Sequence, residues 1–506
     1  MTTDLSFRST TSNKDGEEHM NEETLSLTVG NNVILSIEKD SLIIDGATCE
    51  SKSCTNLFGI CSSETIEECS LPLYNILWAD TSDSHLIINY AKPISAKKIR
   101  PLSLKYLVND YQTESAKKWI VTLLDRSYLS SQKRKRIKIL INPFSGKRSA
   151  VKTFLKNVAP LLEASKCTYD VVHTKYRGHA IEILKEIDLE AYDVVACCSG
   201  DGLPHEAFNG LGKRTDAVRA LSKLAVAQIP CGSGNAMSCN LYGTDSPSLA
   251  TLAIIKGISM SMDLVSITQG EKRYFSFLSQ SVGIIAESDL ATENLRFLGA
   301  FRFTYGFLSR IIEKTVYPCD IAVKVVMDDK HTIKEHYNQE TNYKLSTKSK
   351  FLENSHLFTS LDESLPQLQF GTVNDQLPDG WDLIPYNKLG NFYCGNMAYM
   401  ASGANFFSAA LPNDGLMDLV CINGDISRHL ALKMLLAVEN GSFFDMPGVW
   451  YRKILGYRII PRNQENGYIS IDGERVPFQP FQAEIHKGLG TVLSKNGYLY
   501  EAPGPS

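Results

Sequence analysis

The chain has 506 residues, of which 43% are hydrophobic and 21% are charged, and its formal net charge is −4. This composition is typical of a globular protein of two or three domains and excludes a disordered or fibrous chain. The small net charge excludes a general attraction to nucleic acid or to anionic membrane. The N-terminus lacks the profile of a secretory signal, and no apolar run approaches the roughly 20 residues that span a bilayer. We therefore expect a cytosolic chain.

The residue pattern in the first part of the chain predicts a tail followed by a small β module. Residues 1–23 are polar, which predicts a disordered tail. Short alternating stretches begin at residue 24 and favour a β module, which we extend over residues 24–130 without assigning it a role. The irregular spacing of its cysteines argues against a zinc site, so a structural role is the simplest interpretation and reversible acylation is the alternative. These cysteines are Cys49, Cys54, Cys61 and Cys69.

From residue 134 the pattern changes to alternating strands and helices. Short apolar runs predict strands at 137–141, 169–172, 193–198 and 224–229. Apolar residues at helical spacing follow the first two of these runs. Such alternation indicates βαβ units and a largely parallel sheet. We therefore expect an α/β nucleotide-binding domain over residues 134–263.

Beyond residue 264 the chain is again rich in predicted strands. We expect a β-rich, β-sandwich-like domain over residues 264–495, with helical pieces near 294–310 and 427–437. The stretch 328–380 is polar and has few apolar runs, which predicts a flexible insertion.

Four loops follow the predicted strands at their carboxyl ends, where open α/β sheets bind ligands. Their glycines and small hydroxyl residues let backbone amides approach phosphate oxygens. One such loop alone is most simply a tight turn, but three glycine-containing loops on strand ends favour a polyphosphate site. The loops are 142–147 (Asn-Pro-Phe-Ser-Gly-Lys), 174–178 (Thr-Lys-Tyr-Arg-Gly), 199–203 (Ser-Gly-Asp-Gly-Leu) and 230–235 (Pro-Cys-Gly-Ser-Gly-Asn).

These loops do not match the common nucleotide motifs. A Walker loop requires glycine where Ile141 stands and Ser or Thr where Arg148 stands. The dinucleotide pattern lacks its third glycine at His205, and the protein-kinase pattern lacks it at Met237. Asp201 lies between two glycines, which leave its carboxylate accessible. It is the strongest catalytic candidate, because phosphoryl transfer needs a group that accepts the hydroxyl proton or holds Mg²⁺.

Three segments in order resemble the diacylglycerol-kinase catalytic domain superfamily. They are 142–147, 199–210 (Ser-Gly-Asp-Gly-Leu-Pro-His-Glu-Ala-Phe-Asn-Gly) and 230–237 (Pro-Cys-Gly-Ser-Gly-Asn-Ala-Met). The segment 277–290, which runs on to Arg302, makes the sphingosine kinases, and particularly the fungal long-chain base kinases, the most similar subgroup. The resemblance covers about residues 135–487 apart from the insertion. It departs from the family at Ser145, where a glycine is usual.

The resemblance implies an ATP-dependent kinase that phosphorylates the primary hydroxyl of sphingosine, dihydrosphingosine or phytosphingosine. It implies that Asp201 is the general base, that Mg²⁺ neutralises phosphate charge, and that the β-rich domain binds the lipid. The residues implied to surround ATP are Asn142, Pro143, Phe144, Thr174, Lys175, Tyr176, Arg177, Gly178, Glu206, Gly232, Ser233, Gly234, Asn235, Arg296, Arg302, Asp472, Gly473 and Glu474. Those implied to meet the lipid head group are Ser199, Gly200, Asp201, Gly202 and Asp289.

Asp289 bears on the choice of substrate. A sphingoid base carries a cationic amine that a carboxylate can pair with, whereas ceramide and diacylglycerol carry none. Asp289 is also placed to cap a helix, and the two roles do not exclude each other.

Several alternatives stay open at this point. They are a ceramide or diacylglycerol kinase, a nicotinamide-dinucleotide kinase, and a non-catalytic lipid-binding scaffold on the same fold. We expect peripheral association with intracellular membranes (endoplasmic reticulum, Golgi, endosome) or with the plasma membrane, because the substrate lives in bilayers. We expect no nucleic-acid partner, and a homodimer is one assembly that the sequence allows.

Overall fold

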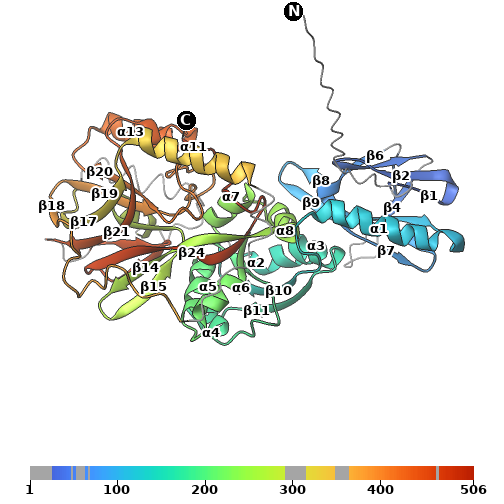
Figure 1. The fold of residues 1–506 in the computed structure, drawn as a ribbon, viewed down its shortest axis with the longest axis horizontal. Helices are drawn as coiled ribbons and strands as arrows, with labels where there is room; N and C mark the ends of the chain where they lie inside the picture. Colours follow the sequence, from blue (N-terminus) through green and yellow to red (C-terminus); the bar gives the residue numbers. More distant parts are fainter. Residues whose placement is uncertain are drawn as a thin grey trace, which may run out of the picture. The chain divides into compact units, whose positions relative to one another are not determined.

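The computed structural model describes residues 25–46, 49–52, 63–66, 69–146, 148–290, 315–347, 364–462 and 467–505. The chain divides into two compact units (Figure 1). The first contains Met1–Ile88 and Ser103–Ser127, and the second contains Asn89–Leu102 and Tyr128–Ser506. The predicted tail, Cys54, Cys61 and the side chains of Cys49 and Cys69 lie outside the described residues.

The N-terminal part of the chain contains two small antiparallel sheets, which confirms the predicted β module. The four-stranded sheet has the order β1 (Ser26–Val29), β2 (Val33–Ile37), β3 (Ser41–Asp45), β6 (Cys69–Pro72). The five-stranded sheet has the order β5 (Ser63–Ile66), β4 (Cys49–Lys52), β9 (Lys98–Leu107), β8 (His85–Ser95), β7 (Ile76–Ser82).

A helix that the sequence analysis did not include, α1 (Thr113–Tyr128), ends this region. Its buried residues Ala116, Trp119, Ile120, Leu123 and Leu124 recur at helical spacing and form one apolar face. The signal for this helix was therefore present in the sequence.

The second unit begins with the predicted parallel sheet, in the order β11 (Thr168–His173), β10 (Arg136–Ile141), β12 (Val194–Ser199), β13 (Ala225–Pro230). Every residue of β12 and β13 is buried, as expected for strands that helices cover on both faces. The helices are α2 (Ala150–Thr153), α3 (Ala159–Ala164), α4 (His179–Lys185), α5 (Gly202–Gly212), α6 (Ala217–Lys223), α7 (Ala236–Tyr242) and α8 (Pro247–Ile255).

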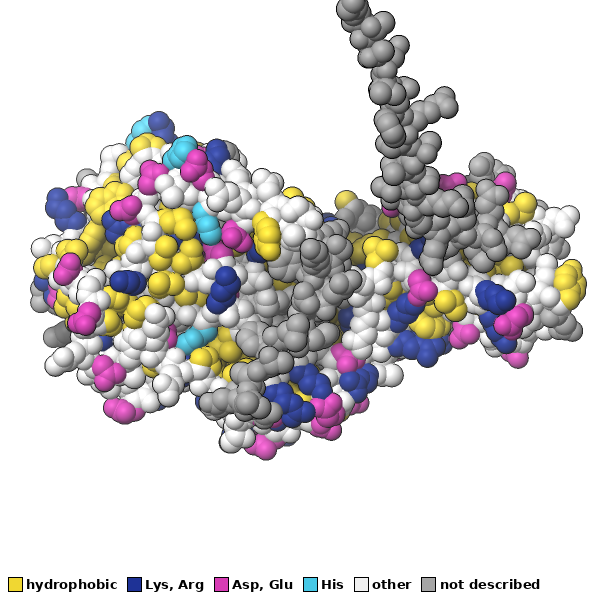
Figure 2. All heavy atoms as spheres, in the orientation of Figure 1, with side chains coloured by type: hydrophobic (Ala, Val, Ile, Leu, Met, Phe, Trp, Pro, Cys, Tyr) yellow, Lys and Arg dark blue, Asp and Glu magenta, His cyan; other side chains and the backbone are white. Residues whose placement is uncertain are grey.

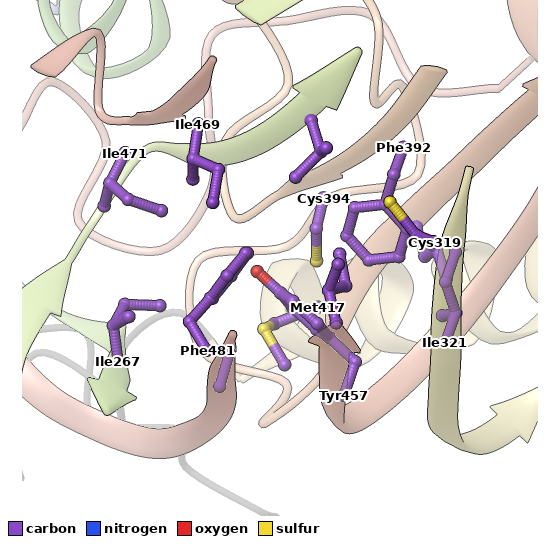
Figure 3. Close-up of a cluster of buried hydrophobic side chains, with 14 of the residues drawn as sticks. Ile267, Cys319, Ile321, Phe392, Cys394, Met417, Tyr457, Ile469, Ile471 and Phe481 are labelled. Carbon is purple, nitrogen blue, oxygen red and sulfur yellow. The ribbon is translucent and has the colours of Figure 1, made fainter. Parts of the chain in front are cut away.

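The sheet continues without a break into the β-rich half. β13 pairs at Val226 with Val492 of β24 (Phe481–Ser494), and the order continues as β21 (Trp450–Pro461), β20 (Met417–Asn423), β19 (Leu389–Gly395), β16 (Ser279–Gly283), β22 (Ile469–Ile471), β23 (Glu474–Val476). Off this path lie β14 (Ile258–Gln269), β15 (Lys272–Ser276), β17 (Cys319–Met327) and β18 (Ile384–Tyr386). Figure 3 shows Phe392, Met417, Tyr457 and Phe481 in the hydrophobic core of this half. The β-rich character predicted for this half is thus confirmed, and the structure places it in one compact unit with the parallel sheet.

The predicted flexible insertion is in part a helix. α11 (Lys330–Ser346) is capped by Asp329, whose side chain accepts a hydrogen bond from the amide of Thr332 (2.8 Å). Ile333 is the one hydrophobic residue that this helix buries, so it lacks the apolar stripe that identifies a helix in sequence. The expectation of a loop was therefore wrong over these residues. Residues 348–363 and the predicted helical piece at 294–310 lie outside the described residues.

Two shorter helices lie in the described part of the β-rich half. α13 (Arg428–Asn440) confirms the helix predicted at 427–437, and α9 (Ile284–Leu290) directly follows β16. Within the described ranges, no helix is both long enough and apolar enough to cross a bilayer.

Candidate functional site

A cavity of about 560 Å³ lies at the carboxyl ends of β10, β12 and β13. All four predicted loops line it on one side, and residues of β16, β19 and the β22–β23 turn line it on the other. Its volume is typical of small-molecule sites. The cavity is therefore shared by the α/β and β-rich halves of the second unit.

Most residues expected at the site line this cavity. They are Asn142, Phe144, Thr174, Tyr176, Arg177, Ser199, Gly200, Asp201, Gly202, Glu206, Gly232, Ser233, Gly234, Asp472, Gly473 and Glu474. Four expected residues do not line it, namely Pro143, Lys175, Gly178 and Asn235. Arg296, Arg302 and the side chain of Asp289 lie outside the described residues.

Close backbone contacts between the loops explain their glycines. A Cβ atom on Gly232 would lie 2.4 Å from the Cα of Gly200, and one on Gly146 would lie 2.4 Å from the carbonyl oxygen of Cys231. Gly146 also has a φ of +53°, a backbone conformation that residues other than Gly, Asn and Asp rarely adopt. The amide of Gly200 donates to Ser145 Oγ (3.0 Å). Ser145, the departure from the family pattern, therefore ties the 142–147 loop to the 199–203 loop.

Asn235 does not line the cavity, but it shapes the 230–235 loop. The amide of Gly232 donates to Asn235 Oδ1 (2.8 Å), and Asn235 Nδ2 donates to the carbonyl oxygen of Gly232 (3.1 Å). Asn235 itself adopts a left-handed conformation with φ +54°. Both ends of its amide are thus used within the loop.

Asp201 has one oxygen held by the protein and one beside the cavity. Its Oδ1 accepts hydrogen bonds from the amide of Met237 (3.1 Å) and from Gln228 Nε2 (3.2 Å). Its Oδ2 lies 3.0 Å from the position that a Cβ on Gly234 would occupy, so the absence of a side chain there leaves room beside it. Burial raises the pKa of Asp201, although the hydrogen bonds from Met237, Ala236 and Gln228 oppose this shift.

Glu206, on α5, holds the loop that precedes α4. Its Oε1 accepts a hydrogen bond from the amide of Gly178 (2.8 Å), and its Oε2 accepts one from the amide of Ala180 (3.1 Å). A carboxylate at the amino end of a helix is also favoured by the helix dipole. Glu206 therefore fixes the position of residues 174–178 at the cavity wall.

Asp472 connects the two halves of the site. Its buried carboxylate accepts a hydrogen bond from His205 Nδ1 on α5 (2.8 Å). It also accepts bonds from the Ser276 hydroxyl (2.6 Å) and from the amides of residues 277–279 (2.9–3.1 Å). Although burial opposes the imidazolium, the hydrogen bond and charge of Asp472 raise the pKa of His205 above its usual value. Both oxygens of Asp472 are thus occupied within the protein.

Glu474 follows Asp472 by two residues, and its side chain contacts the loops at 174–178 and 199–203. It forms an ion pair with Arg177, and its Oε1 lies 2.8 Å from where a Cβ on Gly202 would stand. The β22–β23 turn therefore brings one buried carboxylate, that of Asp472, and one partly exposed carboxylate, that of Glu474, to the loops of the other half.

The far end of the cavity is apolar. A second, smaller pocket adjoins it, and Ile285, Tyr393, Phe406, Leu435 and Val438 line both. Leu435 and Val438 belong to α13, so this helix covers the apolar end. The combined site offers polar loops at one end and space for a hydrocarbon chain at the other.

Several residues of the site were not predicted from the sequence. Gln228 lies inside β13 and reads as an ordinary polar position, and only the fold shows that it supports Asp201. Ser281 and Ser470 line the cavity from β16 and β22. The alternation of Ser279 and Ser281 with apolar or larger residues could have identified a polar strand face.

Carboxylates are present at the site, but they do not form a metal cage. Within the described ranges, no group of three or more His, Cys, Asp or Glu side chains is placed to hold a metal ion. Mg²⁺ is usually bound by one or two carboxylates together with substrate phosphates. Asp201 and Glu474 fit that smaller requirement.

Comparisons with known proteins agree with this geometry. Residues 136–267 match the model of the diacylglycerol kinase catalytic domain, and residues 25–129 match a domain of unknown function, DUF7493. The chain is 33% identical to sphingoid long chain base kinase 4 of Schizosaccharomyces pombe over 469 residues, which cover 92% of this chain and 96% of the relative. It is 39% identical to sphingoid long chain base kinase 5 of Saccharomyces cerevisiae over 422 residues, which cover 74% of this chain but only 61% of that relative.

The comparisons also include a more distant sphingosine kinase and a solved structure. The chain is 27% identical to human sphingosine kinase 1, with 71% of this chain and 91% of the relative covered. A solved structure of a putative diacylglycerol kinase from Bacillus anthracis is 17% identical, covers 72% of this chain and 96% of that one, and gives a TM-score of 0.49. Because that score is low, the fold described above rests on this chain's own sheet order.

Proposed function

The chain belongs to the sphingoid long-chain base kinases and is a lipid kinase, and from this premise we propose that it transfers the γ-phosphoryl group of ATP to the primary hydroxyl of a free sphingoid base. The substrates would be sphingosine, dihydrosphingosine or phytosphingosine, and the product the 1-phosphate. The observation that carries the proposal is one cavity that joins glycine-containing loops, a carboxylate with one oxygen beside the cavity, and an apolar end.

The loop side of the cavity suits the phosphates of ATP. The amides of Gly200 and Gly232 are bonded within the protein, but the loops at 142–146, 199–202 and 232–234 line the cavity, and their remaining backbone amides can approach phosphate oxygens. Arg177 adds a guanidinium at the cavity wall, whose geometry suits phosphate. Arg296 and Arg302 are proposed as further phosphate contacts on the family resemblance.

Asp201 is proposed as the general base for the lipid hydroxyl. A carboxylate with one oxygen fixed and the other beside the cavity can accept the hydroxyl proton as the oxygen attacks phosphorus. Transfer would be direct, without a phosphoenzyme. Mg²⁺, when bound with ATP, would neutralise phosphate charge, and Glu474 is the side chain suited to hold it.

The apolar end of the cavity suits the alkyl chain of the base. Removing that chain from water is favourable by roughly 0.8 kcal/mol per CH₂, which supplies much of the binding free energy. Asp289, on α9, is proposed to pair with the amine of the base. This pairing would favour free bases over ceramide and diacylglycerol, which present no cation.

Peripheral association with membranes is proposed because the substrate resides in bilayers. On the face that Figure 2 shows, hydrophobic side chains gather over the β-rich half. Exposed hydrophobic residues of this half include Ile384, Leu436 and Trp450. Intracellular membranes (endoplasmic reticulum, Golgi, endosome) and the plasma membrane are the candidate surfaces.

A panel of acceptors tests the proposal. Purified protein would be given ATP with sphingosine, dihydrosphingosine, phytosphingosine, ceramide or diacylglycerol in mixed micelles, and phosphate transfer would be measured. We expect transfer to the three free bases only. Transfer to ceramide or diacylglycerol instead would overturn the role of Asp289. Absence of transfer to every acceptor would favour a scaffold that binds lipid without catalysis.

A further inference from the structure

Two serine hydroxyls face the cavity at the boundary between its polar and apolar ends. Ser281 on β16 and Ser470 on β22 are direct cross-strand partners in an antiparallel pair. Their side chains are 3% and 4% exposed, and both line the cavity. Directly opposite residues in such a pair have Cβ atoms roughly 5 Å apart, so one ligand group can contact both hydroxyls. Neither hydroxyl has a hydrogen-bond partner in the described part of the chain.

The opposite face of these strands shows that the serines are a feature of the cavity rather than of the core. The alternate residues Val282, Ile469 and Ile471 belong to the hydrophobic core. Gln280 also points to that side, where its side chain bonds to Ser276 Oγ (2.7 Å) and to the Tyr457 hydroxyl (3.1 Å). Polar groups on the core face are therefore paired, whereas the two serines on the cavity face are not.

The position of the pair along the cavity indicates which ligand group it meets. Ser279 lies two residues before Ser281 on the same face, next to Asp472, whose charge acts on Asp201. On the other side of Ser281 lies its partner on β19, Tyr393, which lines both the main cavity and the apolar pocket. From the catalytic end, the order is thus Asp201, then Ser279, then the Ser281–Ser470 pair, then the apolar residues.

We infer that Ser281 and Ser470 form a hydroxyl-binding subsite that favours sphingoid bases carrying a hydroxyl on carbon 4, such as phytosphingosine. This inference rests on the proposed function. With the hydroxyl of carbon 1 at Asp201 and the alkyl chain at the apolar end, the substituents of carbons 3 and 4 meet Ser279 and the serine pair in turn. A hydroxyl on carbon 4 would enter a region where the remaining wall is largely apolar.

Hydrogen bonds between the two serine hydroxyls and the 4-hydroxyl would distinguish phytosphingosine from bases that lack this group. A buried hydroxyl group without a partner is costly, so the 4-hydroxyl needs the serines and the serines need the 4-hydroxyl. A base without that hydroxyl leaves the pair empty or bound to one ordered water, which recovers part of the loss. We therefore expect a preference on the order of tenfold rather than an absolute one.

The test compares phytosphingosine with dihydrosphingosine, which has the same saturated chain and lacks only the 4-hydroxyl. We expect kcat/KM of the wild type to be on the order of tenfold higher for phytosphingosine. In the double variant Ser281→Ala, Ser470→Ala, this ratio should fall towards one, mainly through loss of kcat/KM for phytosphingosine. Ser288→Ala is the control, because Ser288 also lines the cavity but already donates to the carbonyl oxygen of Ile284 (2.6 Å). That variant should leave the ratio unchanged.

The outcomes separate this inference from the function on which it rests. If the wild type phosphorylates neither base, the proposed function fails. If it phosphorylates both with equal kcat/KM, or if the double variant lowers both values by the same factor, the subsite is wrong and the kinase activity stands. The wild-type ratio needs no variant, and thermal unfolding of the double variant checks that its site is folded.

Discussion

At the scale of single residues, the environment of Asp201 is the decisive feature. We expect Asp201→Asn to lower kcat by about 100-fold or more, because the amide cannot accept the hydroxyl proton. The asparagine can keep the hydrogen bonds from Met237 and Gln228 through its own oxygen, so the thermal unfolding temperature should change little. Asp379→Asn, at an exposed position, is the control for charge removal and should retain activity. An Asp201→Asn enzyme with near-normal kcat would exclude this residue as the base.

The pKa of Asp201 also predicts opposite pH trends for activity and stability. Burial raises this pKa, so the acid limb of the kcat/KM profile should lie above the ordinary aspartate value of about 3.9. A raised pKa means that the folded state favours the protonated carboxyl. The protonated carboxyl of Asp201 therefore contributes its whole stabilising free energy at pH values below the unfolded-state pKa. That contribution is lost as the pH rises through the folded-state pKa.

It follows that Asp201→Asn should be at least as stable as the wild type at neutral pH. Urea unfolding at acidic and neutral pH measures this difference. The raised pKa of Asp201 would be contradicted if the variant lost stability relative to the wild type on going from acidic to neutral pH.

At the scale of elements, α5 positions α4 through Glu206. We expect Glu206→Ala to raise the KM for ATP on the order of tenfold, because the amides of Gly178 and Ala180 lose their acceptors and the 174–178 loop is freed. Glu206→Gln keeps one acceptor oxygen and should show a smaller effect. Glu186→Ala, at the exposed end of α4, is the control and should leave KM unchanged. Equal KM values for all three variants would show that this contact does not shape the ATP site.

A buried ionic cluster lies where β20, β21 and α11 meet. Lys453 contacts Asp414 (3.0 Å) and Asp418 (2.9 Å), and His336 of α11 lies 3.3 Å from Asp414. Lys453 and both carboxylates are almost completely buried. Burial raises the pKa of Asp418 to about 6, even with the lysine beside it.

We expect Lys453→Met to destabilise the protein by about 3–5 kcal/mol near pH 8, because two buried carboxylates lose their cation. The loss should be smaller at pH 5, since Asp418 then takes up a proton and no longer carries an unpaired charge. Urea unfolding at both pH values measures the difference. Lys388→Met, which breaks an exposed pair with Asp425, should cost no more than about 1 kcal/mol. A loss that does not depend on pH would argue against this account.

At the scale of the whole second unit, Asp472 joins the α/β half to the β-rich half. We expect Asp472→Asn to destabilise the protein by about 2–3 kcal/mol, because an amide NH₂ would face donors such as the amide of Phe277. Asparagine tolerates the left-handed backbone at this position (φ +52°), so strain should not contribute. Glu474→Gln, two residues away and partly exposed, should lower activity with little change in stability. If the two variants destabilise the protein equally, Asp472 has no special role in joining the halves.

The sequence by itself determined the local features that depend on neighbouring residues. The apolar runs at 193–198 and 224–229 predicted buried parallel strands, which the structure has at Val194–Ser199 and Ala225–Pro230, and glycines next to Asp201 predicted a phosphate-type site. α1 was equally visible in its apolar spacing, whereas α11 was not, because its surface is polar nearly all round.

Only the tertiary structure decided which distant residues meet. It brings Asp472 to His205 across 267 positions of sequence, places Gln228 behind Asp201, and sets Ser281 opposite Ser470. The sequence does not show that these two serines lie opposite each other, since their pairing depends on the register between β16 and β22. Strand periodicity predicts that side chains alternate, but pairing between strands far apart in the chain is fixed by packing of the complete sheet.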